Sequence, residues 1–171
     1  NLIGDHTDYN DGFVFPAAID RELCLALRPR SDRRIVALTE SAEPVSIAID
    51  EFAPRIHGWG RYLQGVAWSL TEAGYQVRGW EGTVASDIPI GAGLSSSAAI
   101  ELAAALAFGV VSGVTWDPVK IADLCRVAEN RWVGVDSGVM DQIACAMGRS
   151  GHAVLVDCRS MSTTLVPVAG G

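Results

Sequence analysis

The sequence predicts an α+β fold in two layers, one of β-strands in a mixed sheet and one of helices. Strand-type runs fill the first part of the chain, apolar helical patterns dominate the middle, and two more strand-type runs lie near the end. There is no internal repeat, low-complexity tract or linker. Because 171 residues can bury a sizeable core, we expect residues 1–171 to form a single domain.

The strand-type runs are short, apolar and bounded by polar or turn residues. They predict strands at Phe13–Ala17, Leu23–Leu27, Ile35–Leu38, Val45–Ile49, Gly82–Ser86, His152–Asp157 and Thr163–Val168. Between the second and third runs lies an arginine cluster, made of Arg28, Arg30, Arg33 and Arg34. We interpret this cluster as the solvated turn of a hairpin that joins those two strands.

Helical periodicity marks the remaining elements. Helices are predicted at Trp59–Ala73, at the apolar run that includes Ala98–Val111, and after Asp117, which is placed as N-cap with Pro118 at N1. The third of these has a buried stripe made of Ile121, Leu124, Cys125, Ala128 and Trp132. A short helix opened by Ser137 or Gly138 and closed by Gly148 as the C′ residue carries Asp141 in its first turn.

A glycine and serine loop at Pro89–Ala99 runs directly into a helix and looks like a phosphate cradle. Gly91 and Gly93 permit close backbone approach, and the helix start offers unpaired N–H groups to an anion. A Walker loop is disfavoured because no lysine follows, and a dinucleotide fingerprint because Ser96 replaces its third glycine. A serine-rich helix cap remains the alternative.

Two other polar segments are candidate parts of a site. The opening loop offers alternating donors and acceptors, which suits a sugar, although a plain turn is the alternative; these residues are Asp5, His6, Thr7, Asp8, Tyr9 and Asn10. Asp141 could be a base or only a partner of the helix dipole. Glu129 lies at the edge of a buried stripe, where a carboxylate needs a cation or donors unless it reaches solvent.

Together these segments resemble the GHMP family of sugar and mevalonate kinases. The opening loop is similar to the galactokinase signature, Pro89–Ala99 to the family's ATP-binding motif, and Gly138–Gln142 to the segment with the catalytic aspartate. The resemblance is collinear and extends through Trp59–Gly65 and Met147–Ser160. It implies the family's N-terminal domain, whose two-layer fold is also that of domain 2 of ribosomal protein S5.

The resemblance also implies a reaction, in which the γ-phosphoryl of ATP is transferred to the anomeric hydroxyl of galactose. Asp141 is then the catalytic base or the group that orients the hydroxyl. ATP phosphates would be held by Gly91, Ala92, Gly93, Leu94, Ser95, Ser96 and Ser97, Mg²⁺ by Ser97 and Glu129, and the sugar by Asp5, His6, Thr7, Asp8 and Gly138.

The chain departs from the family pattern at three points. Asp5 replaces the usual glutamate, while the family's arginine would precede Asn1 and its sugar-contacting tyrosine would follow Gly171. We therefore expect this chain to be the N-terminal part of a larger enzyme, without the second domain and inactive by itself. The alternatives are a family kinase for N-acetylgalactosamine or arabinose, and a non-catalytic sensor of galactose and ATP.

Composition limits the possible partners. The net charge of −7 argues against nucleic-acid binding, and no apolar run reaches the length of a membrane span. Nothing indicates a signal peptide, so we expect a cytoplasmic protein. Cys24, Cys125, Cys145 and Cys158 show no C-x-x-C pair and are expected to be reduced, buried thiols. The sequence does not predict the oligomeric state.

Overall fold

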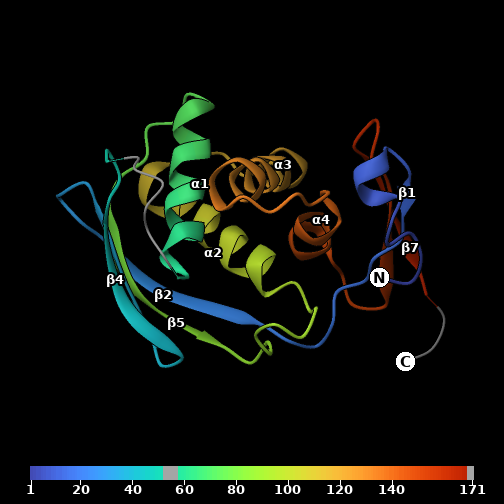
Figure 1. The fold of residues 1–171 in the computed structure, drawn as a ribbon, viewed down its shortest axis with the longest axis horizontal. Coiled ribbons are helices and arrows are strands. Elements are labelled where there is room, and N and C mark those ends of the chain that lie inside the picture. The colour runs from blue at the N-terminus through green and yellow to red at the C-terminus, as the bar shows by residue number, and fades with distance from the viewer. Residues whose placement is uncertain (52–57, 169–171) are drawn as a thin grey trace.

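The computed structural model describes residues 1–51 and 58–168, and it contains four α-helices and seven strands in that part of the chain (Figure 1). A 3₁₀ turn and a π turn complete the regular structure. In chain order the elements are the 3₁₀ turn (Asp8–Asn10), β1 (Phe13–Val14), β2 (Leu23–Pro29), β3 (Arg34–Thr39), β4 (Ala42–Ala48), α1 (Gly60–Glu72), β5 (Trp80–Ser86), α2 (Ser96–Ser112), α3 (Pro118–Ala128), the π turn (Glu129–Val133), α4 (Met140–Met147), β6 (His152–Asp157) and β7 (Ser162–Pro167).

The larger sheet has four strands in the order β2-β5-β3-β4. It is mixed, because β3 runs parallel to β5 while the other neighbours are antiparallel. The predicted hairpin between β2 and β3 is therefore wrong, since β5 lies between them. Trp80 of β5 is fully buried opposite Ile35, and Glu81 forms ion pairs with Arg28 and Arg30. The later strand thus supplies both the apolar contact and the countercharge that a hairpin would lack.

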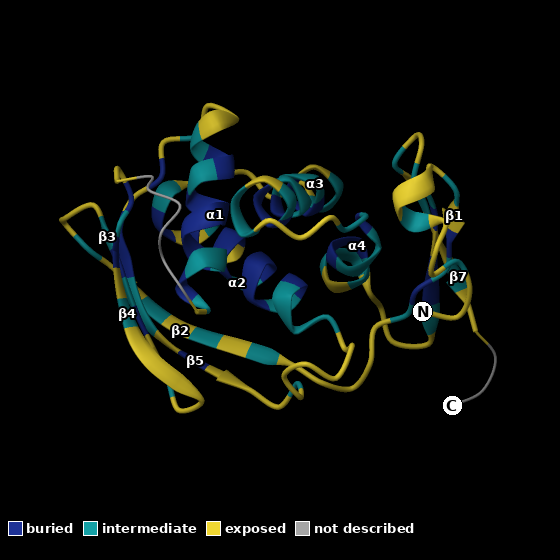
Figure 2. Ribbon diagram, viewed as in Figure 1, coloured by how far each residue is buried: buried dark blue, intermediate teal, exposed yellow. Residues whose placement is uncertain are grey.

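Helices α1 and α2 cover one face of this sheet and α3 packs against both helices (Figure 1). Their facing side chains form the main core, in which Trp80 and Phe108 make an edge-to-face contact with ring centroids 6.3 Å apart. The buried colouring in Figure 2 is concentrated on the sides of the helices and strands that face each other. This two-layer part confirms the predicted α+β class.

A second, three-stranded sheet with the order β1-β6-β7 lies at the other end of the molecule (Figure 1). It packs through Val14, Val154 and Val156 against Ile143 of α4. The predicted strand Phe13–Ala17 is shortened to Phe13–Val14, because the backbone of Phe15 bonds with Leu2 and Ile3 instead. The opening segment is thereby fixed next to the small sheet.

Helix ends agree with the sequence at some places and not at others. The Asp117 side chain accepts a hydrogen bond from the Lys120 backbone N–H and Pro118 occupies the first turn of α3, as predicted. Helix α4 begins at Met140, later than the predicted Ser137 or Gly138, because the Asp8 side chain accepts hydrogen bonds from the backbone N–H groups of Val139 and Met140 and so caps the helix there. Gly148 follows α4 with φ −55°, so it does not adopt the left-handed C′ conformation.

All four cysteines are free, in agreement with the prediction, but only Cys125 is fully buried. Cys24 and Cys145 are exposed and Cys158 is half-buried. The prediction of burial was wrong for Cys24 because its strand has a solvent-facing side, and for Cys145 because it lines an open cavity that α2 and α4 border. Over the described residues, no helix combines the length and apolar character that crossing a membrane requires.

Candidate active site

The glycine and serine loop leaves β5 and ends in the first turn of α2. Gly91, Gly93 and Ser95, at alternate positions, have φ angles of 73°, 72° and 58°. Left-handed residues within a loop turn successive backbone N–H groups toward one side, which is typical of anion-binding sites. No side chain caps the start of α2, so its first N–H groups stay available. The loop keeps the properties of the predicted phosphate cradle.

The opening loop is held by its own hydrogen bonds. The Thr7 hydroxyl lies 2.9 Å from the Gly4 carbonyl oxygen and 2.7 Å from that of Phe13, and His6 Nδ1 lies 2.7 Å from the Tyr9 hydroxyl. Asp5 accepts a hydrogen bond from Asn1 and is exposed. Thr7 therefore shapes the loop, while Asp5 and His6 stay accessible at its surface.

Asp8 joins the opening loop to the helix that carries Asp141. Its Oδ1 accepts hydrogen bonds from the backbone N–H groups of Val139 at 2.9 Å and Met140 at 3.1 Å. A carboxylate at this position caps α4 and interacts favourably with its dipole. The cap comes from 132 residues away along the chain, which brings the sugar-type signature to the first turn of α4.

The contact between the Asp8 carboxylate and the loop before α4 requires glycine at position 138. A Cβ atom at this position would lie only 2.0 Å from Asp8 Cγ and 2.2 Å from each carboxylate oxygen. Sequence reasoning assigned Gly138 to close approach of a sugar. The structure adds that the carboxylate of Asp8 already occupies the space next to it.

Asp141 lies in the first turn of α4 and is half-buried. Burial raises the pKa of Asp141 above its usual value, the nearby Ser95 hydroxyl opposes this increase, and the negative charges of Asp8 and Glu129 add to it. A carboxylate with a raised pKa is a better proton acceptor than an ordinary aspartate. Groups from the phosphate loop, the opening loop and the π turn thus all act on the pKa of Asp141.

Glu129 begins the π turn and is 5% exposed, so it does not reach solvent as an edge glutamate would. Its Oε2 accepts hydrogen bonds from Ser137 Oγ at 2.6 Å and Gln142 Nε2 at 3.0 Å. Both bonds end on one oxygen, which leaves Oε1 for another ligand. Single π turns within helices are frequent at functional sites.

These residues suit magnesium, which prefers carboxylate and hydroxyl oxygens and usually keeps several waters. Ser97 lies in the first turn of α2, four residues before Glu101 and therefore on the same helix face. Glu101 is linked to Glu129 through Gln142. In the described part of the chain, no three His, Cys, Asp or Glu side chains form a metal cage, so the phosphates would have to complete the site.

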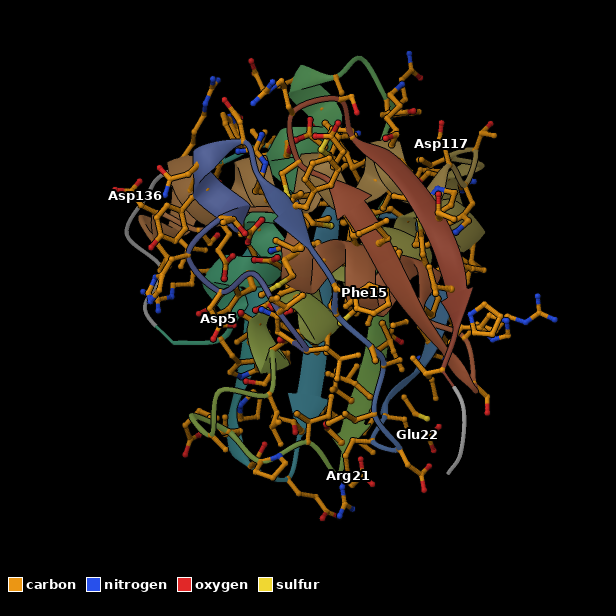
Figure 3. All side chains as sticks on the ribbon, turned by 90° about the vertical axis from the view of Figure 1, so that its right-hand side faces the viewer. Asp5, Phe15, Arg21, Glu22, Asp117 and Asp136 are labelled. Atoms are coloured by element: carbon orange, nitrogen blue, oxygen red, sulfur yellow. The ribbon has the colours of Figure 1, made fainter. Side chains whose placement is uncertain are left out.

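Two cavities flank these residues. One of about 630 Å³ lies between the opening loop, α3 and the loop before α4, and Asp8, Gly138, Asp136 and Arg126 are among its lining residues. In Figure 3 the loop with Asp5 and the segment with Asp136 lie toward the same edge of the molecule. The other cavity, of about 320 Å³, is bordered by Gly93–Ser95, Asn1 and α4.

Glu101, Gln142 and Ser137 also belong to the candidate site, although no motif in the sequence marks them as site residues. Gln142 and Glu101 are completely buried, and Gln142 hydrogen-bonds Glu101 as well as Glu129. The available signal was a charged residue inside the apolar run of α2, which could not be interpreted without its partner. Asn130 supports the same loop through hydrogen bonds with the backbone of Ser137.

Comparison with known families gives two matches. Residues 61–149 match the GHMP kinases N terminal domain, and residues 1–29 match the galactokinase galactose-binding signature. The first match covers more than half of the chain and contains the phosphate loop, Glu129 and Asp141. The second contains Asp5, His6, Thr7 and Asp8.

Curated relatives agree with these matches. The chain is 46% identical over 170 residues to the galactokinase of Roseiflexus sp. strain RS-1, covering 98% of this chain and 43% of the relative. It is 41% identical over 173 residues to the galactokinase of Chloroflexus aggregans, covering 100% of this chain and 44% of the relative. The chain thus spans less than half the length of these relatives.

Solved structures show the same fold. Lactococcus lactis galactokinase complexed with galactose superposes with a TM-score of 0.91 at 32% identity, covering 98% of this chain and 45% of that one. Mevalonate kinase of Methanococcus jannaschii superposes with a TM-score of 0.75 at 17% identity, covering 99% and 53%. At that identity the likeness shows the fold alone. The chain therefore belongs to the GHMP kinase family and has the galactokinase type of N-terminal domain.

Proposed function

We propose that this chain is the N-terminal part of a galactokinase, which transfers the γ-phosphoryl group of ATP to the anomeric hydroxyl of galactose. The observation that carries the proposal is the cap of α4 by Asp8. It brings the galactokinase signature to the helix turn that carries Asp141, and the Ser95 hydroxyl of the phosphate loop acts on the same carboxylate. Both observations support Asp141 as the residue that a sugar and a phosphate would share.

The chemical step follows from this arrangement. The anomeric oxygen forms a bond to the γ-phosphorus, the bond between that phosphorus and the bridging oxygen of ADP breaks, and Asp141 accepts the hydroxyl proton. Products are galactose 1-phosphate and ADP. General-base assistance of this kind contributes about 10²–10⁴-fold, so positioning and charge stabilisation must supply the rest.

The remaining residues bind and orient. Residues 91–97 would hold the phosphates through backbone N–H groups and serine hydroxyls, and Asp5, His6 and Asp8 would bind sugar hydroxyls. Magnesium bound to ATP would screen the charge that develops during transfer. Ser97 and the free oxygen of Glu129 are its candidate ligands from this chain.

The test uses a full-length form, meaning the longer protein that contains this chain or a chimaera with the remaining residues of the Roseiflexus galactokinase. Galactose 1-phosphate formation from galactose and Mg·ATP is followed by ³¹P NMR, with the Asp141→Ala variant as control. We expect turnover in the full-length form and none above the control for residues 1–171 alone.

Other results would contradict the proposal. Faster turnover of N-acetylgalactosamine or arabinose than of galactose would assign a different sugar. Binding of galactose and ATP without any turnover would indicate a sensor. Substantial turnover by residues 1–171 would contradict the expectation that the isolated chain is inactive.

A further inference from the structure

Three buried polar side chains meet beneath the candidate site. Glu101 comes from α2, Gln142 from α4 and Glu129 from the π turn, and their exposed fractions are 0%, 0% and 5%. Gln142 Nε2 lies 3.0 Å from Glu101 Oε2 and 3.0 Å from Glu129 Oε2. One amide group therefore bridges two carboxyl groups from two other elements. Figure 1 shows α2 and α4 adjacent to each other, in agreement with their packing contacts.

Both N–H groups of the Gln142 amide are used as donors. One binds a carboxyl oxygen of Glu101 and the other binds a carboxyl oxygen of Glu129. Within residues 1–51 and 58–168, neither Glu101 nor Glu129 forms an ion pair with a lysine or arginine. Without Gln142, the buried carboxyl groups of Glu101 and Glu129 would each lose the hydrogen bond that this amide donates.

Two oxygens in the cluster have no partner, Glu101 Oε1 and Gln142 Oε1. Burial, followed by the charge of Glu129, raises the pKa of Glu101 to about 9, although its hydrogen bond with Gln142 acts in the opposite direction. Glu101 is then a neutral acid near pH 7.

Gln142 also immediately follows Asp141 in the first turn of α4. Its side chain thus ties the turn that carries the candidate base to the carboxylate of Glu129. Ser137 holds the same oxygen of Glu129 from the loop before α4. With Oε2 fixed by both donors, the direction of Glu129 Oε1 is set by Gln142 and Ser137.

We propose that Gln142 is a positioning residue, which directs the free oxygen of Glu129 toward magnesium by donating its two amide hydrogens to Glu101 and Glu129. The proposal rests on the proposed function, because the magnesium is that of bound Mg·ATP. It goes further by assigning a role to a buried residue that touches neither substrate.

The test compares three variants of the full-length form. Gln142→Leu removes both donors. Gln142→Leu combined with Glu101→Leu also removes the buried acid that loses its partner. Gln64→Leu is the matched control, because Gln64 of α1 is 1% exposed, donates to the backbone oxygen of Glu51 and has an unpartnered Oε1 outside this cluster.

Two readouts are measured for each variant, besides its melting temperature. One is the magnesium concentration that gives half-maximal galactose phosphorylation at saturating ATP. The other is the calorimetric affinity for Mg·ADP, compared with ADP in the presence of EDTA. The second readout does not depend on turnover, so it separates failure of this inference from failure of the proposed function, for which wild-type protein would form no galactose 1-phosphate.

We expect Gln142→Leu to raise the required magnesium concentration tenfold or more and to weaken Mg·ADP without weakening metal-free ADP. The double variant should recover melting temperature but not magnesium affinity, and Gln64→Leu should lower only the melting temperature. A double variant that recovers both properties would mean that Gln142 only stabilises the fold. Magnesium titrations of Gln142→Leu or the double variant that overlay the wild type would also overturn the proposal.

Discussion

Two loops of the candidate site contain glycines that the fold uses for opposite reasons. At Gly91 and Gly93 the backbone has positive φ angles, and a Cβ at either position would have no atom within 4 Å. At Gly138 a Cβ would meet the Asp8 carboxylate at 2.0 Å. The phosphate loop therefore needs glycine for its backbone conformation, whereas the loop before α4 needs it for packing.

The difference indicates how the two halves of the site are prepared. The loop before α4 is tied by hydrogen bonds to Asp8, Asn130 and Glu129 before any substrate binds. All residues of the phosphate loop from 90 to 94 are exposed. Protein groups thus preorganise the candidate sugar and base half, while an anion would complete the candidate phosphate half.

The largest expected effect comes from the preorganised half. In the full-length form, Asp141→Asn keeps the size of the side chain but removes the proton acceptor, so kcat should fall by about 10²–10⁴-fold. Affinity for galactose and Mg·ADP, measured by calorimetry, should change much less. A kcat within threefold of the wild type would mean that Asp141 does not accept the proton, because asparagine can still orient the hydroxyl through a hydrogen bond but is not a base.

Gly138→Ala and Gly91→Ala test the contrast between the loops directly. The first should displace Asp8 from α4, with a cost of about 1–3 kcal/mol from overpacking in addition to the lost cap. The second should cost about 1–2 kcal/mol, because alanine is strained at positive φ. We expect Gly138→Ala to raise mainly the KM for galactose, and Gly91→Ala to raise mainly the KM for ATP.

Both KM values and the melting temperature are measured in the full-length form. The contrast would be lost if both variants raised the same KM, or if Gly138→Ala behaved like the wild type.

Asp8→Ala has a smaller effect in the same half. Loss of a hydrogen bond to a charged group costs about 1.5–3 kcal/mol, so galactose affinity should fall about tenfold or more. Because Asp8 also caps α4, loss of the cap should lower stability by about 0.5–2 kcal/mol. Calorimetry with galactose and with Mg·ADP checks the first effect, and urea unfolding the second. Equal weakening of both ligands would show that Asp8 has only a structural role.

Local signals in the sequence were sufficient for most individual elements. Asp117 and Pro118 marked the start of α3 because an N-cap and an N1 proline act within one turn. Local signals did not predict which strands pair with each other. The predicted hairpin of β2 with β3 was wrong because apolar patterning identifies a strand but does not identify its neighbour, and β5 comes much later in the chain.

The site shows the same limit. Motifs indicated the loops and Asp141, because these residues are contiguous in sequence. Glu101 stood out only as a charge within an apolar run, and its meaning depends on Gln142, which is 41 residues away. The cap of α4 by Asp8 likewise joins two ends of the chain. Contacts of this kind are set by tertiary packing and leave no periodic signal.

The smallest expected effect is the change of the unfolding free energy with pH that the buried Glu101 side chain causes. The groups that face Glu101 are Glu129, Asp141 and the thiols of Cys125 and Cys145. Its pKa is about 9 in the folded chain and is expected to be near the ordinary 4.5 when unfolded. Between these values the folded state binds more protons than the unfolded state, so stability falls as pH rises, by at most about 1.4 kcal/mol per pH unit.

Glu101→Gln keeps a neutral side chain of similar shape and removes this titration. Between pH 6.5 and 7.5 the wild-type chain should therefore lose up to about 1.4 kcal/mol more unfolding free energy than the variant. Urea unfolding of both proteins at the two pH values measures the difference. Asp141, whose raised pKa acts in the same direction, is present in both proteins and largely cancels. Parallel changes in the two proteins would mean that Glu101 is charged in the folded state and that another group compensates its burial.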